Sequence, residues 1–248
     1  MTTLLDTKIP ASLGLTTNLA QTTHFMQGVM TAQAVIATNG IAAIEGVPGT
    51  GKTTTARYVA HTASRPCAIA TMPNRPAPLD LLRHTHKAIT GMPSGRRDTR
   101  FDMQNKLLQI LTDWQGVLIV DELQNTEANA MQELVWLYEE SQHAFGLIIV
   151  GSTVLTAVQK YPQLASRIMG KVIFKPILGK ELLETVRQLD PRLAATPQNA
   201  LVQHDDACAR GLIRTWCKTV DWLNVLGIDE GPVSNEVFAN IRAALPRW

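Results

Sequence analysis

The chain has 248 residues, of which 45% are hydrophobic and 18% charged, and its net charge is only +2. This composition predicts a globular protein with one domain and a small appendage. The small net charge excludes bulk attraction to nucleic acid, so any basic surface must be local. Three cysteines without zinc-site spacing indicate reduced thiols in a cytoplasmic protein, and no apolar run is long enough to predict a membrane span.

The predicted elements begin after a lead-in segment over residues 1–20. Apolar residues at four-three-four spacing predict an amphipathic helix over 22–37. Short apolar runs then alternate with helical stretches over 51–63, 100–113 and 127–141. Runs of this kind are typical of parallel strands buried on both faces of a sheet. The five runs are IAAIE (41–45), CAIAT (67–71), VLIVD (117–121), GLIIV (146–150) and KVIF (171–174).

The pattern changes after Pro176, where the segments are helical and no strong strand occurs. The sequence therefore predicts an α/β core with a five-stranded parallel sheet over residues 21–176. A small all-helical subdomain and a tail are expected over 177–248.

The stretch GVPGTGKTTT (46–55) fits the pattern G-x-x-x-x-G-K-[ST] between a predicted strand and a predicted helix. Its bare loop lets backbone N–H groups wrap a phosphate chain, and the helix N-terminus adds positive potential. Lys52 would reach the outer phosphates, and the Thr53 hydroxyl would bind Mg²⁺. The candidate nucleotide-binding residues are Gly46, Val47, Pro48, Gly49, Thr50, Gly51, Lys52, Thr53 and Thr54.

A magnesium nucleotide site also needs an acid at the end of a neighbouring strand, and VLIVDE (117–122) supplies one. The apolar run carries Asp121 to the C-terminal tip of its strand, where ligands bind in open α/β sheets. Asp121 would bind Mg²⁺, and Glu122 would be the general base for the attacking water.

GVPGTGKT followed by VLIVDE resembles an AAA+ ATPase, a family with a five-stranded parallel core and a helical lid. The resemblance implies ATP and Mg²⁺ as ligands and three further polar positions. Ser152 or Thr153 would orient the water or contact the γ-phosphate. Arg167 would act on the nucleotide of a neighbouring subunit, and Arg214, or else Arg210, would contact the nucleotide from the lid.

The strings VPGTGKTT, DELQN and LASRI resemble the Mu B and TnsC group of AAA+ ATPases, including TniB-like relatives, over roughly residues 20–225. The resemblance implies assembly into hexameric rings or helical filaments on double-stranded DNA of any sequence. It also implies recruitment of a transposase, with a possible target-selection adaptor, and no membrane partner.

The stretch 75–106 is a candidate DNA surface, because it contains seven basic residues and only three acidic ones, all of them aspartates. The region includes the loop GMPSGRR, suited to lie against a phosphate backbone in a salt-sensitive, sequence-independent way. The candidate DNA contacts are Arg83, Lys87, Arg96, Arg97 and Arg100.

Other readings of the same motifs remain open. An ATPase of a secretion or membrane complex, like the ExeA-type proteins, has a similar architecture. A helicase or clamp-loader ATPase shares the phosphate loop and the acid pair. A nucleotide kinase also has a phosphate loop, but it needs neither the acid pair nor Arg167.

Overall fold

The computed structural model describes residues 17–126 and 128–245. Contacts group the chain into two compact units. One, the sheet unit, comprises His24–Gly46 and Lys52–Phe174. The other, the helical unit, comprises residues 17–23, the loop Val47–Gly51 and residues 175–245 of the described chain.

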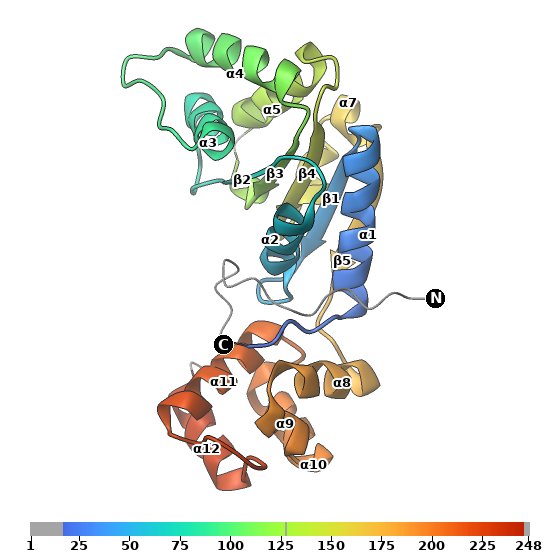
Figure 1. Cartoon of the computed structure of the whole chain (residues 1–248), viewed down its shortest axis with the longest axis vertical. Helices are drawn as coiled ribbons and strands as arrows, with labels where there is room; N and C mark the ends of the chain where they lie inside the picture. Colours follow the sequence, from blue (N-terminus) through green and yellow to red (C-terminus); the bar gives the residue numbers. More distant parts are fainter. Residues whose placement is uncertain (1–16, 127, 246–248) are drawn as a thin grey trace. The chain divides into compact units, whose positions relative to one another are not determined.

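The sheet unit alternates strands and helices along the chain, as Figure 1 shows. Its strands are β1 (Ile41–Gly46), β2 (Cys67–Thr71), β3 (Val117–Asp121), β4 (Gly146–Gly151) and β5 (Ile168–Phe174). Its helices are α1 (Thr23–Thr38, with Thr23 in the other unit), α2 (Lys52–Thr62), α3 (Pro78–Thr90), α4 (Arg100–Trp114), the short 3₁₀ helix η2 (Leu123–Asn125), α5 (Ala128–Glu140), α6 (Val154–Val158) and α7 (Pro162–Ala165).

The five strands form one parallel sheet in the order β2-β3-β4-β1-β5, which confirms the predicted fold class. All residues of β3 and β4 are buried, as expected for strands covered on both faces. Because parallel strands end at the same edge, the register brings Glu45 of β1 beside Gly151 of β4 and Thr71 of β2 beside Asp121 of β3. Asp121 and the residues that follow β3 and β4 therefore lie at the carboxyl end of the sheet. Arg167 precedes β5 and lies at the opposite end.

Each face of the sheet has its own helices. A core of apolar side chains from α3, α4, α5, α6 and α7 packs against one face, with Leu118, Val120 and Leu147 among the strand residues. On the other face, α1 and α2 come so close that a Cβ on Gly28 would lie 2.8 Å from Thr55 Cγ2. Figure 1 shows α1 and α2 on the near side of the sheet.

The helical unit contains short helices around a separate apolar core that includes Trp216 and Phe238. Its helices are α8 (Gly179–Leu189), α9 (Pro191–Ala195), α10 (Gln198–His204), the π-helix η3 (Asp205–Ala209), α11 (Ile213–Val225) and α12 (Asn235–Ala244). Asp190 caps α9 by accepting a hydrogen bond from the Arg192 amide, and Pro191 occupies the first helical position.

Several element bounds differ from the sequence predictions. The last strand begins at Ile168 rather than residue 171, because it is an edge strand that pairs with β1 from Ile41 onward and exposes alternate residues. The stretch 180–193, predicted as continuously helical, breaks at Asp190 into two helices. By its contacts, the helical unit also includes residues 21–23 and the loop Val47–Gly51. Most of the predicted lead-in segment lies outside the described residues.

Candidate nucleotide site

Asp121 lies at the end of β3 with only 3% of its surface exposed. Its Oδ2 accepts a hydrogen bond from Thr53 Oγ1 at 2.9 Å, and its Oδ1 accepts one from the Glu122 amide at 2.9 Å. Burial raises the pKa of Asp121, although these two hydrogen bonds oppose the rise. The structure thus joins residues that lie 68 positions apart in the sequence.

The pair Thr53–Asp121 fits Mg²⁺, because it places a hydroxyl and a carboxylate oxygen side by side. Mg²⁺ prefers such hard oxygen ligands, and it is usually held by one or two protein carboxylates together with substrate phosphates and water. No group of three or more His, Cys, Asp or Glu side chains suited to a metal occurs within residues 17–126 and 128–245. A site with a single carboxylate is therefore the magnesium arrangement that this edge of the sheet offers.

Glu122 follows Asp121 in a left-handed backbone conformation, with φ of +60°. This conformation is uncommon for a residue with a side chain. Its carboxylate Oε2 accepts a hydrogen bond of 2.5 Å from Gln124 Nε2 on η2. The predicted general base is thus half-buried and has a fixed amide neighbour.

Lys52 is the first residue of α2, and its side chain is largely buried. Its Nζ donates a hydrogen bond of 2.6 Å to the carbonyl oxygen of Gly46, at the end of β1. The ammonium group is therefore held at the same carboxyl end of the sheet as Asp121. Thr54 is half-buried on the first turn of α2.

The loop Val47–Gly51 has its own contacts within the helical unit. Thr50 Oγ1 donates to the Val47 carbonyl oxygen at 2.9 Å, and the Arg214 amide donates to the Gly49 carbonyl oxygen at 3.0 Å. Gly49 has φ of +92°, and a Cβ there would lie 3.2 Å from Arg214 Cβ. Glycine is required at this point for both reasons. Pro48 is exposed.

Arg214 and Arg210 are both exposed. Of the two, Arg214 has a backbone hydrogen bond to the loop Val47–Gly51. Arg214 lies in the first turn of α11, and its backbone bond to Gly49 fixes its position along the loop. Arg210 precedes that helix in a left-handed conformation, with φ of +49°. Arg214 is therefore the one of the two whose backbone contacts the loop Val47–Gly51.

Ser152 and Thr153 follow β4 directly. The Ser152 amide donates to Gln124 Oε1 at 3.0 Å, and its side chain is half-buried. Thr153 is exposed and precedes the first residue of α6. Ser152 is thus the one with a described connection to the residues around Glu122.

Arg167 immediately precedes β5, the position predicted for an arginine that acts on a neighbouring subunit. Its Nη1 makes an ion pair with Glu139 of α5 and a contact of 2.8 Å with His143 Nε2. Arginine has no acceptor, so Arg167 Nη1 is the donor in this contact. Within one chain, then, the guanidinium is bound to α5 and the turn that follows it.

Residues 36–158 match the family model described as AAA domain. The matched segment covers just under half of the chain. It includes the phosphate loop, Asp121, Glu122 and Ser152, whereas Arg167 and Arg214 lie beyond the match. A search of curated proteins gives no match.

Solved structures resemble the chain beyond this matched segment. The ORC2 protein of Aeropyrum pernix in its ADP form has a TM-score of 0.65 at 18% identity, covering 89% of this chain and 67% of that one. The ORC1 protein of the same organism in complex with DNA has a TM-score of 0.68 at 16% identity, covering 90% and 65%.

The Holliday junction branch migration motor RuvB of Thermotoga maritima has a TM-score of 0.58 at 17% identity, covering 91% of this chain and 70% of that one. At these identities the likeness shows the fold alone. The chain spans about two thirds of the length of the structures that it matches.

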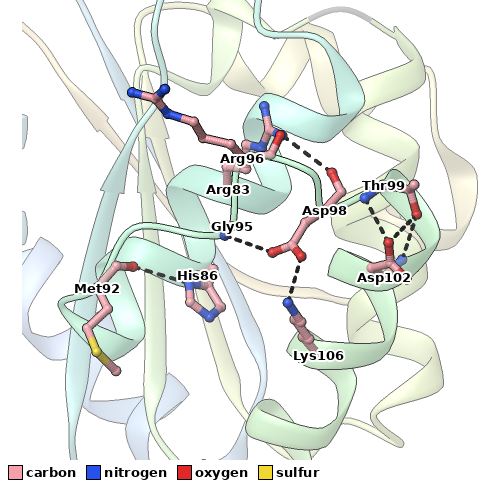
Figure 2. A network of polar contacts seen from close by, with 9 residues as sticks. All are labelled: Arg83, His86, Met92, Gly95, Arg96, Asp98, Thr99, Asp102 and Lys106. Carbon is pink, nitrogen blue, oxygen red and sulfur yellow. Dashed lines mark hydrogen bonds and ion pairs between the residues drawn. The ribbon is translucent and has the colours of Figure 1, made fainter.

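The candidate DNA surface over residues 75–106 includes the loop 91–99 between α3 and α4 (Figure 2). Asp98 organises it by accepting hydrogen bonds from the Gly95 amide at 2.9 Å and from Lys106 Nζ at 2.8 Å. Arg83 Nη2 reaches the carbonyl oxygens of Arg96 and Asp98 at 3.5 and 3.4 Å. Thr99 and Asp102 form a capping box at the start of α4.

This arrangement separates the five predicted DNA contacts. Arg96 and Arg97 are exposed on the loop, and Lys87 is exposed on α3. Arg83 is half-buried and braces the loop. Arg100 is exposed but forms an ion pair with the buried Glu133 of α5. The loop therefore presents two arginines, whereas Arg83 and Arg100 also hold the local structure.

Sequence reasoning missed several residues of this matched segment. It assigned nothing to Gln124, which bonds to both Glu122 and the Ser152 amide, or to Glu139 and Glu133, which pair with the predicted arginines. Only the string DELQN, with its amide two residues after the base, gave a local signal for one of them.

Proposed function

We propose that this chain is a magnesium-dependent ATPase that assembles with copies of itself on double-stranded DNA and regulates DNA transposition. The observation that carries the ATPase assignment is the bond between Thr53 and Asp121, with Glu122 next in sequence at the same edge of the sheet. A phosphate loop, a magnesium carboxylate and a base in this arrangement are the parts that ATP hydrolysis needs.

Each residue has a distinct role in the proposed reaction. Amides of the loop bind the phosphates, and the Lys52 ammonium neutralises their outer charge. Thr53 and Asp121 hold Mg²⁺, which supplies further charge neutralisation when bound. Glu122 orients the attacking water and accepts its proton. Arg167 of a neighbouring copy stabilises charge on the transferred phosphoryl group, which makes hydrolysis depend on assembly.

The exposed Arg96 and Arg97 support the DNA-binding part of the proposal. They lie on a loop that is already fixed by Asp98 and Arg83, so little order has to be gained on binding. Phosphate contacts by arginine do not read base sequence, which fits binding to any duplex. Among the described residues, no helix is both long and apolar enough to cross a membrane.

The first test compares the parent chain with Glu122→Gln. Phosphate release from MgATP is measured with and without duplex DNA, and nucleotide affinity is measured separately. Glu122→Gln should bind nucleotide like the parent but hydrolyse it at least about 100-fold more slowly, the usual contribution of a general base. Equal hydrolysis by both proteins would contradict the ATPase assignment.

The second test addresses assembly and biological role. Electron microscopy with MgATP and duplex DNA of unrelated sequences should show rings or filaments on the DNA. A chain that stays monomeric under these conditions, or that ignores DNA and co-purifies with membrane components, would exclude the transposition role. A transposition assay with and without the chain then measures target selection directly.

A further inference from the structure

Gln124 connects the tip of β3 to the tip of β4 through both ends of its side-chain amide. Its Nε2 donates to Glu122 Oε2 at 2.5 Å, and its Oε1 accepts from the Ser152 amide at 3.0 Å. A weaker contact of 3.5 Å joins Nε2 to Asn125 Oδ1. The amide is therefore fixed in one orientation, because exchanging its oxygen and nitrogen would break both of the shorter bonds.

The surrounding backbone makes room for this bridge. A Cβ on Gly151 would lie 1.8 Å from Gln124 Oε1 and 2.6 Å from Val154 Cγ1. Any side chain at the last residue of β4 would thus displace the Gln124 amide. Glu122, at the other end of the bridge, has a left-handed backbone. In this conformation its amide donates to Asp121 Oδ1, and its carboxylate accepts from Gln124 on η2.

We infer that Gln124 is a positioning residue for Glu122. It occupies a lone pair on Oε2 and leaves Oε1 to accept from the attacking water. Because Gln124 Oε1 is bound to the Ser152 amide, a displacement of the end of β4 also displaces the Glu122 carboxylate. This inference rests on the proposed ATPase function and assigns a role to a residue outside the nucleotide motifs.

Two substitutions separate the donor and acceptor functions of the amide. Gln124→Glu keeps an acceptor for the Ser152 amide but places a second carboxylate against Glu122, beside the negative Asp121 and near Lys52. Gln124→Met has a similar length and neither function. Gln132→Glu is the matched control, because it makes the same change on the exposed face of α5.

The first readout is hydrogen exchange at the Ser152 amide, which needs no hydrolysis. Gln124→Met should exchange this amide at least about tenfold faster than the parent, whereas Gln124→Glu should retain its protection. Equal protection in the parent and Gln124→Met would overturn the bridge itself. Thermal unfolding of each variant verifies that the sheet unit is folded.

The second readout is kinetic. Gln124→Met should lower kcat at least about tenfold while KM for ATP changes less than about threefold, as expected when only the base is misplaced. Gln124→Glu should also lower kcat, because a carboxylate cannot donate the hydrogen bond that holds Glu122 Oε2. Gln132→Glu should leave both quantities unchanged.

The outcomes separate this inference from the proposed function. If Glu122→Gln abolishes hydrolysis while both Gln124 variants keep the parent kcat, the positioning role is wrong and the ATPase assignment stands. A rise in KM that accounts for the whole loss would make Gln124 a nucleotide-binding residue and also overturn the inference. A parent chain that binds MgATP without hydrolysing it would remove both.

Discussion

Arg167 and Glu139 form an ion pair between the start of β5 and the last turn of α5, with both side chains about one third exposed. Arg167 also lowers the pKa of Glu139, which His143 lowers further. A guanidinium meant for another subunit's nucleotide must leave this pair. The Arg167–Glu139 ion pair therefore opposes the proposed action of Arg167 on a neighbouring subunit's nucleotide. The pair would break only when assembly offers the guanidinium an anion that it binds more strongly than Glu139.

The first prediction follows from this pair. Glu139→Gln removes the competing charge, so the assembly-dependent rise in ATPase activity should occur at a several-fold lower protein concentration. Arg167→Ala should abolish that rise. Phosphate release measured against protein concentration checks both, with Glu140→Gln on the same helix as the control. An unchanged curve for both variants would contradict a role for Arg167 in trans.

The second prediction concerns Lys52. Lys52→Ala removes a buried ammonium held by the Gly46 carbonyl oxygen. Nucleotide affinity should fall by roughly 10- to 100-fold, the value of a charge-assisted hydrogen bond to phosphate. A fluorescent ATP analogue measures the change. Lys160→Ala, at an exposed lysine of the same unit, should bind like the parent, and parent-like binding by Lys52→Ala would refute the phosphate site.

The third prediction is the salt dependence of DNA binding. If Arg96 and Arg97 each neutralise one phosphate, replacing both with Ala should reduce the slope of log K against log salt by about 1.8, since each contact contributes about 0.9. The weakening should be the same for unrelated duplexes. Arg187→Ala, at an exposed arginine of the helical unit, is the control, and a slope unaffected by the double variant would exclude this loop.

The fourth prediction concerns stability of the helical unit. Arg192 binds both carboxylate oxygens of the buried Asp190 and also Asn224 Oδ1. Arg192→Met would leave the buried Asp190 carboxylate without its charged partner, so the free energy of unfolding should fall by about 3–5 kcal/mol. Denaturant unfolding monitored by tryptophan fluorescence, with the core Trp216 as a reporter, measures it. A change below about 1 kcal/mol would show that the pair is dispensable.

The same pair gives a pH dependence with a defined sign. Burial alone would raise the pKa of Asp190, but the hydrogen bonds and charge of Arg192 hold it below the ordinary value of 3.8. A depressed carboxyl pKa stabilises the fold above the unfolded pKa and loses that contribution as pH falls through the folded one. The destabilisation caused by Arg192→Met should therefore shrink below about pH 4.

The phosphate loop, the strand runs and Asp121 were predictable from sequence because each depends on neighbouring residues. A bare loop between an apolar strand and a helix is a local pattern, and so is an acid pair after four buried residues. The helix α4 is also locally specified, since Thr99 and Asp102 form its capping box. The end of the chain's last strand at Phe174 was predicted, but its start was not, because β5 pairs on one side only.

The sequence by itself therefore determined that this protein has a parallel α/β core with a phosphate loop and an acidic strand end. Only the tertiary structure decided which distant side chains meet: Thr53 with Asp121, Gln124 with the Ser152 amide, and Arg167 with Glu139. The reason is that strand order and helix placement set these neighbours. Those are fixed by the packing of the whole core, which no short pattern encodes.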